Sequence, residues 1–141
     1  MRLELTRRGD YAIRAMLALG RAQGQRLSTP VMADSMSIPV RFLPQVMGDL
    51  SRAGLVRSTA GRQGGYELAR PADSIDLLTI IEAVEGDTRR RTCVLRGGPC
   101  RHDGACAVHE PFAAAQEALR DRLAAVSLGS LAGERRSGSA G

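Results

Sequence analysis

Residues 41–70, RFLPQVMGDLSRAGLVRSTAGRQGGYELAR, change their pattern halfway along. In the first half the apolar residues recur every three or four positions: Leu43, Val46, Met47 and Leu50. This spacing predicts a helix with one buried face. In the second half the runs LVRST and YELAR flank the glycine-rich stretch AGRQGG, which predicts two short strands joined by a hairpin turn. The stretch therefore predicts a helix followed directly by a β-hairpin.

Two helices are expected before this stretch, and one directly after it. Thr6 is a suitable N-cap for an amphipathic helix, and Ser28 or Thr29 caps a second, short one. After the hairpin, SIDLLTIIEAVEG predicts a fourth helix, which we expect Ser74 to cap. Three helices followed by a hairpin is the order of a winged helix-turn-helix. We therefore expect a mainly α fold, with a winged helix-turn-helix DNA-binding domain at residues 1–85.

The composition favours an anionic partner. The chain has 141 residues, a net charge of +5 and a sequence pI near 10, and all 20 of its basic residues are arginines. Aromatic residues make up only 3%, which argues against stacking on single-stranded bases, so double-stranded DNA is the expected partner. No stretch is long and apolar enough for a membrane span or a secretory signal, so we expect a cytoplasmic protein without membrane contact. No catalytic triad, carboxylate pair or phosphate-binding loop is visible, and we expect no enzymatic activity.

The helix that follows the turn would read the DNA bases. Its solvent-facing side carries Arg41, Gln45 and Arg52, and arginine and glutamine can form paired hydrogen bonds to guanine and adenine. Asp49 lies on the same side, and because its charge repels phosphate we interpret it as an ordinary solvated residue. Pro44 lacks a backbone N–H, which indicates that the regular helix begins late or with an irregular turn.

Five further residues are expected to contact the DNA backbone: Arg57, Arg62 and Gln63 on the hairpin, and Arg7 and Arg8 at the start of the first helix. A glycine-rich hairpin tip that carries an arginine is typical of a wing that follows the DNA backbone or enters the minor groove.

The segment CVLRGGPCRHDGACAVHE contains all three cysteines of the chain, Cys93, Cys100 and Cys106, followed by His109. In a reducing compartment such a cluster indicates metal ligands or redox-active thiols before structural disulfides. Three cysteines and one histidine could hold zinc, whereas the wide, glycine-rich spacing and the nearby arginines also suit an iron–sulfur cluster. A disulfide switch and unligated thiols remain open as well. We assign residues 86–108 to this loop.

The helical pattern returns after the cysteines. We expect one long helix over residues 109–132, with an apolar stripe that includes Phe112, Leu119, Leu123 and Val126. Little of the chain remains to cover this stripe, so pairing with a second copy is the simplest way to bury it, although packing on its own domain is the alternative. The polar tail, residues 133–141, is expected to be disordered.

Three parts of the chain resemble the IscR/NsrR-type family of bacterial winged-helix regulators: RRGDYAIRAM near the N-terminus, the block from FLPQVMGDL to GGYELAR, and the cysteine loop before the last helix. The resemblance covers roughly residues 1 to 132. It implies a homodimer that binds inverted-repeat DNA as a transcriptional regulator, and we expect a repressor. It also implies that Cys93, Cys100 and Cys106 bind a [2Fe–2S] or [4Fe–4S] cluster that responds to nitric oxide, redox stress or iron–sulfur status.

The resemblance offers two residues as the fourth cluster ligand. In the iron–sulfur-assembly regulators of the family it is a histidine shortly after the third cysteine, which matches His109. In a nitric-oxide-sensing relative it is an aspartate of the first helix from the other subunit, which matches Asp10. We favour Asp10, because its helix also carries the arginines expected to contact DNA.

Overall fold

The structure, a computed structural model, describes residues 2–62, 64–88 and 107–138, with side chains up to residue 133. Its elements in chain order are α1 (Arg7–Arg21), α2 (Thr29–Met36), the 3₁₀ turn η1 (Val40–Phe42), α3 (Leu43–Arg52), β1 (Val56–Thr59), β2 (Gly65–Leu68), η2 (Ala72–Ser74), α4 (Leu77–Glu85), α5 (His109–Ala124) and α6 (Leu128–Gly138). Three helices followed by a two-stranded antiparallel hairpin confirm the expected winged helix-turn-helix.

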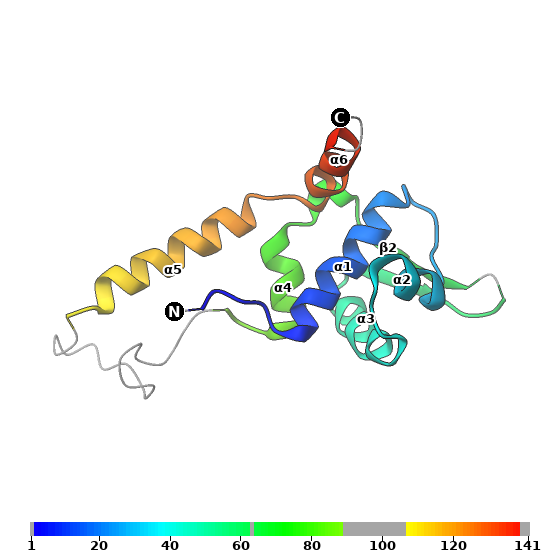
Figure 1. The fold of residues 1–141 in the computed structure, drawn as a ribbon, viewed down its shortest axis with the longest axis horizontal. Coiled ribbons are helices and arrows are strands. Elements are labelled where there is room, and N and C mark those ends of the chain that lie inside the picture. Colours follow the sequence, from blue (N-terminus) through cyan, green and yellow to red (C-terminus); the bar gives the residue numbers. More distant parts are fainter. Residues whose placement is uncertain (1, 63, 89–106, 139–141) are drawn as a thin grey trace.

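Helix α1 is the centre of the domain. It contacts α2, α3, α4, α6 and β2, and Figure 1 shows it crossing the body, with the hairpin projecting on one side and α5 on the other. The core that surrounds it is built from fully buried side chains: Ala12, Ala15, Met16 and Leu19 of α1, Met32 of α2, Leu43, Val46, Met47 and Leu50 of α3, and Ile80 of α4. No helix among the described residues is both long and apolar enough to cross a membrane.

Helix ends follow the capping residues of the sequence. The hydroxyl of Thr6 accepts the N–H of Gly9 at 3.1 Å and Ser28 accepts that of Val31 at 3.4 Å, as expected for N-caps. Pro44 lies in the first turn of α3, directly after η1, and this confirms the irregular start. The predicted cap of α4 was wrong. Asp76 caps it, with its Oδ1 2.8 Å from the N of Thr79, because Ser74 ends the preceding turn η2.

The single long C-terminal helix was also a wrong prediction. The chain breaks between Ala124 and Leu128 into α5 and α6. Leu128 is 1% exposed in the core of the domain, and its N–H donates to the carbonyl of Ile75 at 2.7 Å. Burial of Leu128 turns the chain back onto α1 and η2. Helix α6 extends to Gly138, whereas a disordered tail was expected from residue 133. Residues 139–141 lie outside the described part of the chain.

The wing depends on two adjacent glycines. A Cβ on Gly64 would lie 2.1 Å from the carbonyl oxygen of Thr59, inside the turn, and a Cβ on Gly65 would lie 2.5 Å from the carbonyl oxygen of Leu27. Leu27 approaches this closely because it pairs with Tyr66 through two backbone hydrogen bonds of 2.8 and 2.9 Å. The glycines therefore fix the hairpin to the segment before α2.

Replacing Gly65 with alanine should lower the free energy of unfolding by on the order of 2 kcal/mol, because backbone atoms of Leu27 or of the wing must move. Gly133→Ala is the matched control: a Cβ there meets nothing within 4 Å, and alanine in an exposed helix should raise the free energy of unfolding by about 0.5–1 kcal/mol. Urea unfolding followed by circular dichroism measures both. Equal stability of Gly65→Ala and wild type would contradict this account of the wing.

Candidate functional site

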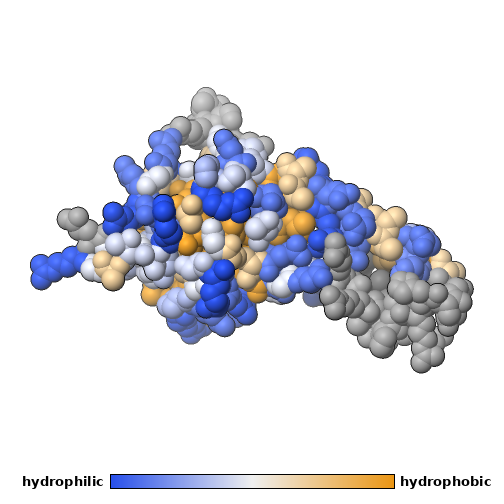
Figure 2. Space-filling view, turned by 180° about the vertical axis from the view of Figure 1, so that it is seen from behind, coloured by the Kyte–Doolittle hydropathy of each residue, from blue (hydrophilic) through white to orange (hydrophobic). Residues whose placement is uncertain are grey.

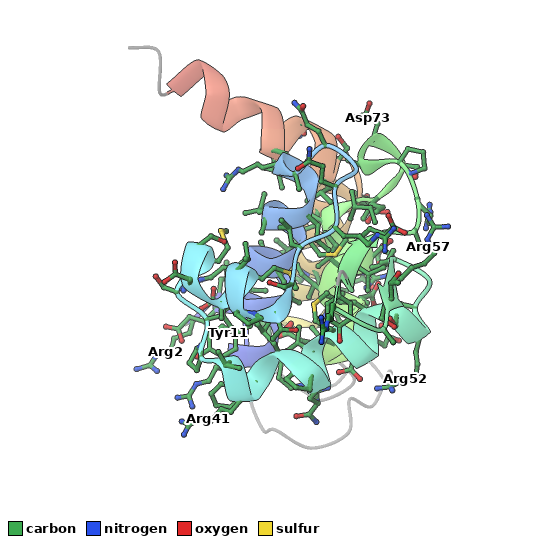
Figure 3. All side chains as sticks on the ribbon, turned by 90° about the vertical axis from the view of Figure 1, so that its right-hand side faces the viewer. Arg2, Tyr11, Arg41, Arg52, Arg57 and Asp73 are labelled. Atoms are coloured by element: carbon green, nitrogen blue, oxygen red, sulfur yellow. The ribbon has the colours of Figure 1, made fainter. Side chains whose placement is uncertain are left out.

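Helix α3, which is the expected DNA-reading helix, exposes the side chains that the sequence predicts to contact DNA bases. Leu43, Val46, Met47 and Leu50 are buried on one side of α3, so Gln45 and Arg52 are exposed on the other. Arg41 is also exposed, but it lies in η1, one turn before α3 begins. Arg41, Gln45 and Arg52 form an exposed strip. Figure 3 shows Arg41 and Arg52 near the two ends of this strip, both reaching away from the molecule. A helix that presents one exposed row in this way can enter a major groove.

An aromatic ring organises the start of the reading helix. Phe42 of η1 packs against Tyr11 of α1, with ring centroids 5.3 Å apart and the planes tilted by 35°. The guanidinium of Arg41 lies 4.9 Å from the centroid of Phe42, and that of Arg7 lies 6.0 Å from it. Cations within about 6 Å of a ring face are attracted to it, so Phe42 brings two of the predicted DNA contacts together.

A carboxylate organises the other end of the strip. Asp49 of α3 forms ion pairs with Arg8 of α1 and with Arg52, three residues further along α3. The Asp49 side chain is only 13% exposed, whereas those of Arg8 and Arg52 are 43% and 73% exposed. The interpretation of Asp49 as an ordinary solvated residue was therefore wrong. Its charge is largely enclosed by two guanidinium groups.

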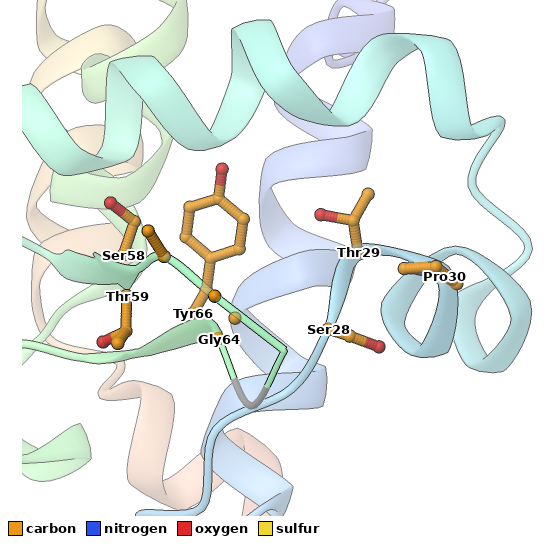
Figure 4. A pocket seen from close by; sticks show the side chains of 10 residues that line it. Ser28, Thr29, Pro30, Ser58, Thr59, Gly64 and Tyr66 are labelled. Carbon is orange, nitrogen blue, oxygen red and sulfur yellow. The ribbon is translucent and has the colours of Figure 1, made fainter.

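The wing carries two separate arginines. Arg57 on β1 lies 3.7 Å from Glu67, its cross-strand partner on β2, and Arg62 is exposed at the hairpin tip. Gln63 lies outside the described residues. A pocket of about 350 Å³ separates the wing from the start of α2, and hydroxyl-bearing side chains from both sides line it: Ser28, Thr29, Ser58, Thr59 and Tyr66. Figure 4 shows the Tyr66 ring standing between Ser58 and Thr29.

The three cysteines lie outside the described residues, but Thr88, near the start of their segment, is held by several hydrogen bonds. Thr88 donates its N–H to Glu82 Oε2 at 3.0 Å, and its carbonyl accepts from Gln116 Nε2 at 3.1 Å. Arg120 Nη1 lies 3.2 Å from Glu82 Oε2 and also bonds to the Thr88 hydroxyl. The Arg120 side chain is only 13% exposed. This polar clamp, made of Glu82, Thr88, Gln116 and Arg120, ties the start of the cysteine segment to α4 and α5 together.

The two candidates for the fourth ligand occupy different places. Asp10 accepts two hydrogen bonds from Arg14, at 2.8 and 3.1 Å, and its side chain is 43% exposed. His109 is the first residue of α5. Figure 1 shows α5 projecting from the body as an arm. The start of α5 lies at the outer end of this arm, away from the start of α1. Within the described ranges, no group of three or more potential metal ligands gathers.

The first part of the expected apolar stripe, on α5, is uncovered, and its last part is half-buried. Phe112 is 39% exposed and Leu119 is 42% exposed, while Leu123 and Val126 are half-buried. Val126 lies against its own domain, because its carbonyl accepts the N–H of Leu77 at 2.9 Å. Figure 2 shows apolar patches along this arm as well as over the body.

Several residues of these sites were missed by sequence reasoning. Phe42 could have been recognised from its position beside Arg41 in the turn that precedes the reading helix. Asp49 could have been recognised from Arg52, because carboxylate and guanidinium pair at this spacing on a helix. The pairing of Arg8 with Asp49 and of Arg120 with Glu82 connects residues 41 and 38 positions apart, and no local pattern signals either one.

Taken together, the exposed face of α3, the arginines around Phe42 and Asp49, and the projecting wing define a winged-helix DNA-binding protein. A model of the Rrf2 family, described as iron-dependent transcriptional regulators, matches residues 5–134. The chain belongs to the Rrf2 family and is an HTH-type transcriptional regulator. Its relatives and fold neighbours are transcriptional regulators and not enzymes.

Similar proteins cover almost the whole chain. An HTH-type transcriptional regulator of Neisseria meningitidis serogroup A is 33% identical over 137 residues, which are 96% of this chain and 92% of the relative. The regulator IscR of Vibrio campbellii is 31% identical, over 92% of this chain and 77% of its own. Among solved structures, CymR, the global cysteine regulator of B. subtilis, superposes with a TM-score of 0.78 at 27% identity, covering 94% of this chain and 98% of its own. IscR of T. potens superposes with a TM-score of 0.72 at 24% identity, covering 94% and 88%, and supports the fold.

Replacing Gln45 with alanine should relax discrimination at one base pair in each half-site, by about 1–3 kcal/mol, because its side chain is exposed at the centre of the reading face. Competition binding with duplexes that differ at single positions measures this. Gln25→Ala is the control, since Gln25 is exposed in the segment that joins α1 to α2 and is not part of α3. Unchanged discrimination by Gln45→Ala would place the reading face elsewhere.

Proposed function

We propose that the protein is a homodimeric repressor whose affinity for an inverted-repeat operator depends on an iron–sulfur cluster bound by Cys93, Cys100 and Cys106. The observation that carries this proposal is that every cysteine of the chain lies in the segment that joins α4 to α5. The family description as iron-dependent regulators and the similarity to IscR support it. The cluster would be of the [2Fe–2S] or [4Fe–4S] type.

The donor set suits such a cluster. Thiolates are its usual protein ligands, and the five arginines of the segment favour the thiolate form and offset the negative charge of the cluster: Arg89, Arg90, Arg91, Arg96 and Arg101. Asp10 or His109 would supply the fourth ligand. A cluster with one oxygen or nitrogen ligand has an iron at which nitric oxide, oxidants or thiols can displace that ligand, which would suit sensing of nitric oxide, redox stress or iron–sulfur supply.

The polar clamp gives the cysteine segment a route to the rest of the protein. Thr88 is the last described residue before the cysteines, and its backbone is bound to Glu82 of α4 and Gln116 of α5. A change in the segment would therefore act first on the angle between these two helices. If α5 pairs with its copy, that angle sets the distance between the two reading helices, which must match half-sites about 34 Å apart.

The uncovered stripe of α5 supports the homodimer. Phe112 and Leu119 are large apolar side chains exposed on one side of the helix, and isologous packing of two such helices would remove both from water. A dimer also explains how one small domain could recognise an inverted repeat, because each subunit would contact one half-site.

A second function is favoured by the same donor set. Cys93, Cys100, Cys106 and His109 form a Cys₃His group, which is a common ligand set of structural zinc sites. In that case the protein would be a zinc-stabilised DNA-binding regulator without a sensing cluster. The two functions differ in the colour and metal content of the purified protein.

Protein purified without air should be brown, with iron, sulfide and visible absorption. Alanine at Cys93, Cys100 or Cys106 should abolish or strongly destabilise this absorption, because too few thiolates remain. Alanine at the true fourth ligand, Asp10 or His109, should leave a labile cluster with a shifted spectrum. His102→Ala, which removes the other histidine of the chain, is the control and should match wild type. Colourless protein with stoichiometric zinc would contradict the cluster and support the second function.

Replacing both Phe112 and Leu119 with glutamate should produce monomers, because the charges would be buried at the centre of the interface. Ala114 is exposed on the opposite side of α5, so Ala114→Glu is the matched control and should remain dimeric. Sedimentation equilibrium measures the mass of each variant. A dimeric double variant would move the interface away from this stripe.

A further inference from the structure

Asp49 is unusual for a residue on a DNA-reading helix, because its charge repels phosphate. Yet it is 13% exposed and paired with two arginines, one from α1 and one from α3. Arg8 and Arg52 both remain substantially exposed, at 43% and 73%. The group formed by Arg8, Asp49 and Arg52, here called the Asp49 triad, keeps one net positive charge and therefore still attracts DNA.

We infer that Asp49 is a positioning residue for sequence-specific DNA binding, which fixes Arg8 and Arg52 in the orientation that the operator requires. The inference rests on the proposed operator binding. A guanidinium has five N–H donors, and in each arginine of the triad one nitrogen, Nη2, bonds to Asp49. Both arginines therefore retain donors for phosphate oxygens or base edges. They also lose less conformational freedom on binding DNA, because the ion pairs already restrict their side chains.

The triad also determines where the reading helix lies. Arg8 is on the first turn of α1 and Asp49 on the last turns of α3, so their ion pair ties two helices together at the DNA-facing surface. Apolar packing between α1 and α3 is not directional, whereas an ion pair with hydrogen bonds fixes position and rotation. The effect of Asp49 on binding is therefore expected to pass through its arginines and not through direct contact with a base.

The test uses the full chain and a duplex that the wild-type protein selects from a random pool, with poly(dI-dC) as non-specific DNA. Asp49→Asn keeps the size of the side chain and removes one negative charge. General electrostatics predicts tighter binding to all DNA. The positioning role predicts affinity for the selected duplex lowered by on the order of tenfold, with affinity for poly(dI-dC) unchanged or higher. Asp34→Asn is the matched control, because Asp34 is exposed on α2 and forms no ion pair with a described residue; it should bind both DNAs as wild type does or more tightly.

A double-mutant cycle separates positioning from other roles. In a protein that carries Arg8→Gln and Arg52→Gln, the further change Asp49→Asn should cause no further loss of specific affinity. A loss that persists there would mean that Asp49 contacts a base directly, and parallel losses for both DNAs with a lower Tm would mean that it only stabilises the fold. Either result overturns the inference, as does wild-type specificity of Asp49→Asn. Failure of the wild-type protein to enrich any duplex would instead overturn the proposed operator binding.

Discussion

Four helices and one strand pack closely against α1, and this packing sets the position of α3 relative to the rest of the domain. Half of the buried residues of α1 are alanines, and these three, Ala12, Ala15 and Ala18, are at most 7% exposed. Small side chains let the axes of adjacent helices approach, and this explains how a single helix contacts four others and a strand. A larger residue at Ala12 or Ala15, both 0% exposed, would have to displace a neighbouring part of the core.

The first two turns of α1 serve two surfaces at once. On one side Arg7 and Arg8 meet Phe42 and Asp49 at the reading helix. On the other side Glu85, at the end of α4, accepts the N–H of Thr6 at 2.6 Å. The Glu85 carboxylate approaches Gly9 so closely that a Cβ there would lie 3.0 Å from its Oε1. A carboxylate at a helix N-terminus is favourable electrostatically as well, so the end of α4 and the reading helix are both held to the same short stretch of α1.

The sequence predicted those parts of the fold that local chemistry determines. Thr6, and either Ser28 or Thr29, were identified as caps because a hydroxyl at the N-cap satisfies a free N–H whatever the tertiary structure. Pro44 indicated an irregular turn because it lacks an N–H. The break before Leu128 could not be predicted, because an apolar stripe shows that residues are buried and does not show against what. Asp49 was misread partly for a related reason, although its pairing with Arg52 follows a local helix spacing. Its partner Arg8 lies 41 positions away, and only the folded structure brings the two together.

The way in which α5 is held differs from the way in which the body is held, and the difference bears on the proposed regulation. The core around α1 is apolar and closely packed, and such packing resists small displacements. Helix α5 has no buried residue of its own; it is attached through the polar clamp at Thr88 and Arg120 and through the chain that leads to the buried Leu128. Hydrogen bonds and ion pairs can exchange partners one at a time, so their rearrangement requires no cavity in the core. Helix α5 is attached to the winged-helix domain by polar contacts. It can therefore change its angle while that domain, with the arginines around Phe42 and Asp49, keeps its shape.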